Sequence, residues 1–146
     1  MASPMNAVGK ALFTKLTGAS SLTSLLSAGT AGVFENVAQQ NEDVPYVVFN
    51  AQSPSTPLYA FGNAATVKIE DIIYQVKGIT EGHSAAPGGT IADKINDTLN
   101  GATLTVTGYT SLQISRIQDI DYPEVVQGGK RFNHRGALYR VRVFST

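Results

Sequence analysis

Cysteine and tryptophan are absent from this chain, and its only two histidines, His83 and His134, stand far apart in the sequence. The absence of cysteine excludes disulfides and thiolate metal sites. The stretch from residue 72 to 101 reads as an apolar strand, a glycine-rich break and an amphipathic helix, without a group of residues from which a catalytic site would be built. Residue types alone therefore do not indicate a reaction.

Charge is also scarce. Eleven basic and eleven acidic residues give a net charge of zero, and charged residues make up 15% of the chain. A soluble domain typically carries about 25% charged residues, and a small monomer usually keeps its net charge away from zero. Two interpretations are open: a low-charge protein rich in small polar residues, or a subunit whose flanks are buried by neighbours.

The 146 residues suit a single domain spanning residues 1–146. A chain of this size buries roughly two-thirds of its unfolded surface, which is enough for a core without metals or disulfides. No apolar run approaches the roughly 20 residues needed to span a bilayer. Lysines inside the apolar pattern of the first 16 residues make a poor signal peptide. We expect a soluble, cytosolic protein without a membrane partner.

Apolar residues at helical spacing predict an N-terminal helix over residues 6–17. Val8, Leu12, Phe13 and Leu16 fall on one stripe, and a glycine follows the last turn. The other two predicted helices cover residues 21–26 and 90–100.

The last of these helices has the clearest signals. Ile91, Ile95 and Leu99 form its apolar stripe, and an Asn-Gly pair follows it. Thr90 and Asp93 have the spacing of a capping box. We therefore expect this helix to begin at Thr90 and to pack one side on a sheet.

Runs rich in β-branched and aromatic residues predict strands. A slip in the alternation of one of them predicts a bulge at Glu70 and Asp71. The segment Ser53–Pro57 is expected to form a turn or an extended arm. The last two strands are expected to form a hairpin, joined by a long loop from Asp121 to Arg135. The predicted strands cover residues 33–37, 45–50, 66–80, 103–106, 111–120 and 136–144.

This order predicts an α+β fold. It consists of a mostly antiparallel sheet, with the N-terminal helix and one central helix packed on one face. The long hairpin loop is expected to protrude from the body of the molecule, and loops of this length are usually functional.

Two features invite an enzymatic hypothesis. Residues 82–90 are glycine-rich and precede a helix, as phosphate-binding loops do, but they lack the lysine and the spacing of a P-loop. His83 and Ser84 resemble a base with its nucleophile, but adjacent residues in an extended loop rarely point at each other. A strand-to-helix connection explains the segment better, and we assign no catalytic or cofactor-binding residue.

Carboxylates near the end of the predicted strand 111–120 are the one candidate metal site. Asp119 and Asp121 share a strand face, and Glu124 follows them. Carboxylate oxygens suit a divalent cation. Solvated acids at a strand end are much commoner, so we assign no metal ligand.

The C-terminal part of the chain is basic, with no acidic residue from position 127 onward. Three interpretations are open: contact with a nucleic-acid backbone, electrostatic complementarity at a protein interface, and a solvated strand face. Overall neutrality favours the interface. Two valines beside a Gly-Gly pair give the predicted loop an apolar tip. The candidate interface residues are Val125, Val126, Lys130, Arg131, Arg135, Arg140 and Arg142.

A series of landmarks covers nearly the whole chain in order, and it resembles the tail-completion, or tail-terminator, proteins of long-tailed bacteriophages. The landmarks are ALFTKLTG, SLTSLLS, PYVVFN, IIYQVKGITEG, TIADKINDTLNG and RGALYRVRVFS. The resemblance implies a non-enzymatic virion protein that uses no cofactor. Members of the family form a ring, commonly of six subunits, that caps the tail tube when it reaches its set length. The ring then offers a surface to the head-side connector.

The implied partners are other copies of the chain, the tail-tube protein and a head–tail connector or head-closure protein. The implied location is the head-proximal end of the virion tail, after assembly in the host cytoplasm. Contact with DNA in the ring lumen stays open. The alternatives are a neck or head-closure protein, a tail-tube subunit or, more distantly, a small hydrolase or nucleotide-binding enzyme that uses His83, Ser84 or the acids near Asp119.

Overall fold

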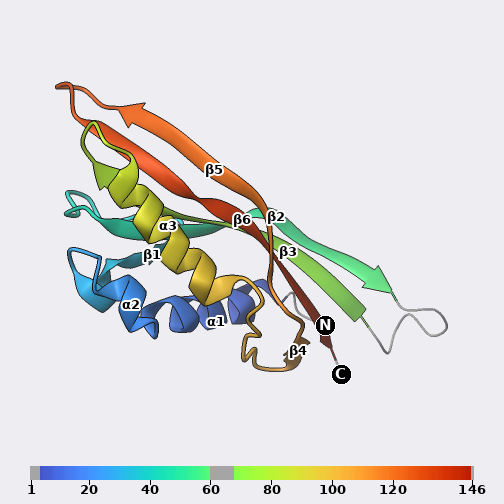
Figure 1. Cartoon of the computed structure of the whole chain (residues 1–146). Helices are drawn as coiled ribbons and strands as arrows, with labels where there is room; N and C mark the ends of the chain where they lie inside the picture. The colour runs from blue at the N-terminus through green and yellow to red at the C-terminus, as the bar shows by residue number, and fades with distance from the viewer. Residues whose placement is uncertain (1–3, 60–67, 146) are drawn as a thin grey trace.

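The computed structural model describes residues 4–59 and 68–145 (Figure 1). Along the described chain, three helices precede three strands, and a further helix precedes the last three strands. The predicted α+β fold is confirmed. The elements are α1 (Met5–Thr17), α2 (Ser20–Thr23), the 3-10 helix η1 (Gly29–Gly32), β1 (Val33–Glu35), β2 (Tyr46–Tyr59), β3 (Lys68–Glu81), α3 (Ala86–Leu99), β4 (Tyr109–Ser111), β5 (Ser115–Val125) and β6 (Arg131–Ser145).

The strands form one sheet in the order β1-β2-β3-β6, and both β4 and β5 pair with the outer edge of β6. Only the pairing of β1 with β2 is parallel. β3 and β6 pair without a register shift from Lys68 opposite Ser145 to Glu81 opposite Phe132. β5 pairs with the first two-thirds of β6, so the predicted hairpin of the last two long strands is confirmed.

The two long helices lie on one face of the sheet, which we call the covered face, and the opposite open face carries no helix among the described residues (Figure 1). The predicted stripes of α1 and α3 are buried there, except that Phe13 is 42% exposed. Phe13 follows Leu12 directly, so it points about 100° away around the helix. The core between helices and sheet includes Val8, Leu12, Leu16, Ile91, Ile95, Leu99, Ile72, Tyr74, Val76, Tyr139, Val141 and Val143.

The middle of β2 and β3 differs from the prediction in two ways. The bulge predicted at Glu70 and Asp71 is wrong, because β3 pairs continuously with β6; the register shifts lie instead in β2, between residues 51 and 56. The segment Ser53–Pro57 continues strand β2, because it is paired with β3. Residues 66 and 67 of the predicted strand lie outside the described residues.

Helix α3 begins four residues before the predicted start. Pro87 occupies its first turn, where a missing N–H costs nothing. Thr90 is thus inside the helix, where its hydroxyl donates a hydrogen bond to the carbonyl of Ala86 at 3.3 Å. The predicted capping box is wrong, since Thr90 lies inside the helix and the N-cap residue, Ala85, makes no side-chain cap hydrogen bond. The helix ends as predicted, with Asn100 as the C-cap and Gly101 at a φ of 78°.

The long loop predicted from Asp121 to Arg135 is wrong. β5 continues to Val125 and β6 begins at Arg131, so residues 126–130 alone connect the strands. Gly128 and Gly129 have φ values of 95° and 81°, a left-handed conformation that permits a tight reversal.

The strand predicted over residues 103–106 is extended but does not join the sheet. An isolated bridge between Val106 and Tyr109 is its one β contact among the described residues. The strand predicted over residues 111–120 is split, because the chain leaves the sheet between β4 and β5, where Ile114 is buried.

Candidate interface on the β5–β6 hairpin

The seven predicted interface residues lie in three places on the hairpin. One group surrounds the connecting loop at the end opposite to the C-terminal end of β6 (Figure 1). Arg135 lies on the covered face, while Arg140 and Arg142 lie on the open face near the other end of β6. The group at the loop consists of Val125, Val126, Lys130 and Arg131. The structure thus does not bring the seven residues together in one patch.

The group at the loop, which we call the hairpin tip, is the most exposed of the three. Val125 is 71% exposed, and Lys130 and Arg131 are exposed beside it. The Val126 amide donates to the Lys130 carbonyl at 3.0 Å and closes the turn. The Gly82 amide donates to the Arg131 carbonyl at 2.9 Å and ties the tip to the end of β3. The tip therefore presents an apolar side chain and two cations on a fixed backbone.

Arg135 is already engaged within its own subunit. Its Nη2 donates to Oδ2 of Asp121 at 2.9 Å, across the β5–β6 ladder. This hydrogen bond lowers the pKa of Asp121 and raises that of Arg135. The pair is exposed to solvent, so it contributes little stability. It fixes the position of Asp121 on the covered face.

Arg142 is engaged more firmly, since it forms two hydrogen bonds with Asp71 on β3. The donor–acceptor distances are 2.6 Å for Nε to Oδ1 and 2.7 Å for Nη2 to Oδ2. The Asp71 side chain is only 19% exposed, and its hydrogen bond to Arg142 lowers its pKa. Arg140 is exposed on the same face, in a shallow hollow lined also by Leu112, Gln113 and Ser115.

A buried histidine holds β5 against β6 on the open face. His134 Nε2 lies 2.6 Å from Oε2 of Glu124, and its ring stacks on Tyr122 at a centroid distance of 4.5 Å. Lys77 of β3 donates to the Tyr122 hydroxyl at 2.5 Å. Burial lowers the pKa of His134, partly offset by its hydrogen bond to Glu124. The neutral ring therefore donates from Nε2, and its buried Nδ1 has no hydrogen-bond partner among the described residues.

No pattern in the sequence indicates this cluster. His134 stands among basic residues in the sequence, whereas its side chain is buried. The cluster depends on the register of β5 on β6, which places Tyr122 opposite His134. That register was hidden because the segment was expected to be a loop.

β5 itself is exposed on both faces along its length. Every residue of the strand except Ile120 is exposed, and among the described residues its second edge pairs with no strand. Three of the six exposed large apolar side chains of the described chain lie on this strand: Ile117, Tyr122 and Val125. Leu112 lies just before it, and Phe13 and Val37 lie elsewhere. A long open edge with apolar side chains is a surface that proteins usually cover.

The enzymatic candidates are not assembled into a site in the described structure. His83 and Ser84 are exposed and share no hydrogen bond, and the Ser84 hydroxyl accepts from the Ala86 amide at 3.3 Å. Asp119 and Asp121 do lie on one strand face, but they pair with Arg116 and Arg135.

No group of three potential metal ligands occurs within residues 4–59 and 68–145. Among the same residues, none of the helices has the length and apolar character to cross a membrane.

The described part of the chain thus forms a mostly antiparallel sheet with helices on one face and an open, partly apolar edge at β5. The family model described as Tail completion protein gp17 matches residues 10–144, so the chain belongs to this family of tail completion proteins. It is a structural protein of a phage-like tail, and the resemblance seen in the sequence is confirmed.

Comparison with solved structures supports the fold. A chain described as "Virion of native gene transfer agent (GTA) particle" superimposes with a TM-score of 0.68 over 97% of both chains, at 20% sequence identity. At this identity the likeness shows a shared fold. The comparison with curated proteins finds no match.

Proposed function

We propose that this tail completion protein assembles into a closed ring that caps the tail tube and ends its elongation. The ring then presents the surface on which a head–tail connector or head-closure protein docks. The observation that carries the proposal is β5, an eleven-residue edge strand exposed on both faces, in a protein of the tail completion family.

Ring closure requires a heterologous contact, in which one flank of a subunit binds a different flank of the next. A stable contact typically buries on the order of 1,600 Å² in total. The β5 edge supplies one flank with exposed apolar side chains, and its charged side chains need partners of opposite charge on the next subunit when they leave water. Capping by this route is a binding event and uses no catalytic residue.

The hairpin tip is the proposed contact to the adjoining subunit or the tail tube. Lys130 and Arg131 are exposed there, and no ion pair within the described part of the chain engages either of them. Arg135 and Arg142 have the lesser role of holding the hairpin and sheet together, because both are paired internally. Arg140 remains a candidate contact at the opposite end of the hairpin.

The proposed partners are other copies of the chain, most simply six in a ring, the tail-tube protein and the head-side connector. The proposed location is the head-proximal end of the virion tail, after assembly in the host cytoplasm. The gene transfer agent chain supports this setting, because a protein of the same fold is described as part of a virion.

Electron microscopy of the purified protein at high concentration tests the proposal. We expect closed rings of uniform size. Long tubes would favour a tail-tube subunit, which stacks without limit, and separate monomers would contradict the proposal.

The double variant Lys130→Glu/Arg131→Glu tests the hairpin tip, since it reverses both cations at an exposed site. We expect it to fold normally and to lose binding to its neighbour in the ring or to the tube. Lys94→Glu, in the middle of α3 and outside the hairpin tip, is the control. Normal rings and normal capping by the double variant would remove the tip from the interface.

A further inference from the structure

The segment from Thr103 to Thr107 has the side-chain pattern of a strand but no strand beside it. Leu104 and Val106 are 5% and 6% exposed, whereas Thr103, Thr105 and Thr107 are exposed. This alternation is the mark of a strand with one face on a core.

The backbone of its first three residues is unpaired in the described structure. No hydrogen bond joins the backbone of Thr103, Leu104 or Thr105 to another described residue. The chain is nevertheless fixed on either side. The Ile114 amide donates to the Ala102 carbonyl at 2.8 Å, and the Tyr109 amide donates to the Val106 carbonyl at 3.2 Å. A fixed, extended segment with free amides and carbonyls is a template for pairing with another strand.

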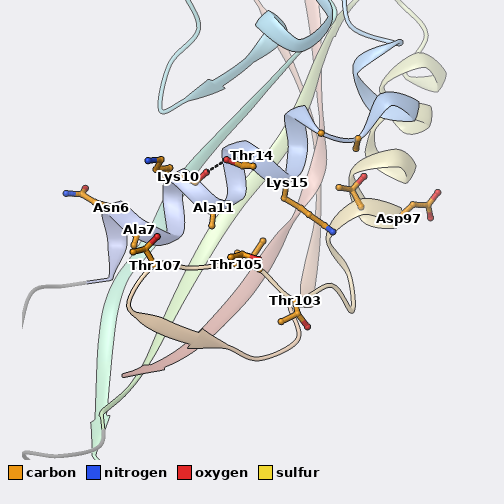
Figure 2. Close-up of a pocket in the computed structure, with 14 residues that line it drawn as sticks. Asn6, Ala7, Lys10, Ala11, Thr14, Lys15, Asp97, Thr103, Thr105 and Thr107 are labelled. Carbon is orange, nitrogen blue, oxygen red and sulfur yellow. Dashed lines mark hydrogen bonds between the residues drawn. The ribbon is translucent and has the colours of Figure 1, made fainter. Parts of the chain in front are cut away.

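A groove of about 920 Å³ separates this segment from α1 (Figure 2). Ala7 and Ala11 form part of its helical wall, and Lys15 extends from α1 into the gap toward the threonines. Lys10 also lines the groove, and Asp97 of α3 stands at one end. Neither lysine has an ion-pair partner within the described part of the chain. The groove is thus apolar and threonine-lined, with an excess of positive charge.

The open edge of β5 has the complementary properties. Asp119, Asp121 and Glu124 outnumber the one cation of the strand, Arg116. Because the Val126 amide bonds to β6, the alternation of an antiparallel ladder turns the backbone groups of Val125, Asp121 and Asp119 away from β6. Arg135 of β6 pairs with Asp121 and offsets part of this charge, so the edge is weakly acidic. Its outward-facing amides and carbonyls have no strand partner among the described residues, and Pro123 between them has no N–H.

We infer that the groove between α1 and residues 103–107 receives the β5 edge of a second copy of the chain. The inference rests on the proposed ring function and specifies its subunit contact. Opposite charge favours the pairing of a groove with an edge over the pairing of two grooves or of two edges. α1 and β5 lie along opposite borders of the subunit, as Figure 1 shows, so each copy offers one surface to each neighbour. Such a contact is heterologous, and a heterologous contact forms a ring when the rotation between neighbouring subunits closes.

Engineered disulfides test the contact directly, because the chain has no cysteine of its own. Each variant carries one cysteine in the groove, from Thr103→Cys, Thr105→Cys or Thr107→Cys, and one on the edge, from Asp119→Cys or Asp121→Cys. Oxidation of the assembled protein is followed on non-reducing gels. A disulfide forms only when the two Cα atoms lie about 4.4–6.8 Å apart, so the correct register selects one or two of the six pairs.

The expected result is a ladder of covalent oligomers that extends to the ring size. The control pair combines Asp121→Cys with Thr110→Cys, an exposed threonine of β4 whose partner in the sheet is Phe144, on the open face. It should give no ladder. The double reversal Lys10→Glu/Lys15→Glu, added to a cross-linking pair, should reduce the ladder at least about tenfold, because like charges then face each other.

Two other results would overturn the inference. If the protein forms rings by mass but no groove–edge pair cross-links, or the control cross-links equally, the contact lies elsewhere and the ring proposal still stands. If the protein stays monomeric under all conditions, the ring proposal and this contact fail together.

Discussion

β5 and β6 pair with each other along most of β5, yet they occupy very different environments. β6 is hydrogen-bonded on both edges, and its residues Ala137, Tyr139, Val141 and Val143 are buried under the helices. β5 is bonded on one edge only, and all of its residues but one are exposed. β6 therefore holds the subunit together, whereas β5 keeps one edge and both faces open within the described chain. Changes in β6 should therefore alter folding, and changes in β5 should alter assembly.

Gly136→Val in β6 should have the largest effect on folding. A Cβ at this position would lie 1.9 Å from the carbonyl oxygen of Val76, which the backbone cannot accommodate without moving β3. We expect a loss of about 3 kcal/mol or more in the free energy of unfolding, or no folded protein. Gln118→Val on β5 is the control and should change it by less than about 0.5 kcal/mol. Circular dichroism monitored during thermal unfolding measures the stability of both variants. Equal losses would contradict the expectation that β6 matters more for folding than β5.

A pair of isoleucine substitutions separates folding from assembly. Ile95→Ala leaves a cavity beneath α3, where the side chain is fully buried, and should cost about 2–5 kcal/mol of stability. Ile117→Ala on β5 removes a side chain that is 42% exposed, so it should leave the monomer's stability nearly unchanged and weaken the oligomer. Urea unfolding and sedimentation velocity on the same samples check the two halves. Intact assembly of the β5 variant would remove Ile117 from the interface.

The arginines of the two strands provide a smaller contrast. Arg142→Met strips the largely buried Asp71 of both hydrogen bonds and should cost about 1–3 kcal/mol. Arg116→Met breaks an exposed pair with Asp119, 3.5 Å long, and should cost no more than about 0.5 kcal/mol. Denaturant titration at pH 7 gives both values. We expect Arg142→Met to lose more stability than Arg116→Met. A larger loss for Arg116→Met would contradict this expectation.

The smallest expected effect is the pH dependence due to His134. Burial holds its pKa in the folded protein below the 6.5 of the unfolded chain. Below pH 6.5 the unfolded state therefore binds more protons, and stability falls as the pH drops toward the folded pKa. His134→Gln should flatten this slope, whereas His83→Gln, at an exposed loop position, should leave it unchanged. Unfolding curves between pH 7.5 and 5.5 (about one unit either side of the unfolded pKa) measure the slope, and an unaltered slope in His134→Gln would contradict this account.

The parts of the fold that could be predicted from sequence are those with one buried side. α1, α3 and β6 each bury alternate or periodic apolar residues, so their patterns report their structure. The second half of β5 gives no such pattern because both of its faces are exposed, and its strand form depends on pairing with β6. The segment 53–57 likewise became strand through pairing with β3, despite its two prolines.

The candidate interface was only partly predictable for the same reason. The hairpin tip was identified from its valines and cations, whereas the internal pairing of Arg135 and Arg142 depends on strand register that the sequence does not reveal. The segment 103–106 is the converse case. Its pattern predicted a strand, and the structure keeps the extended form but supplies no partner within the described chain.

The most direct test of ring formation is the mass of the purified protein in solution, measured by sedimentation equilibrium from micromolar to millimolar concentration. We expect a discrete closed oligomer that grows no further. For a six-membered ring the mass is about 92 kDa, six times the 15.4 kDa of one chain. A single 15.4 kDa species at millimolar concentration would contradict the proposal that the chain assembles into a ring.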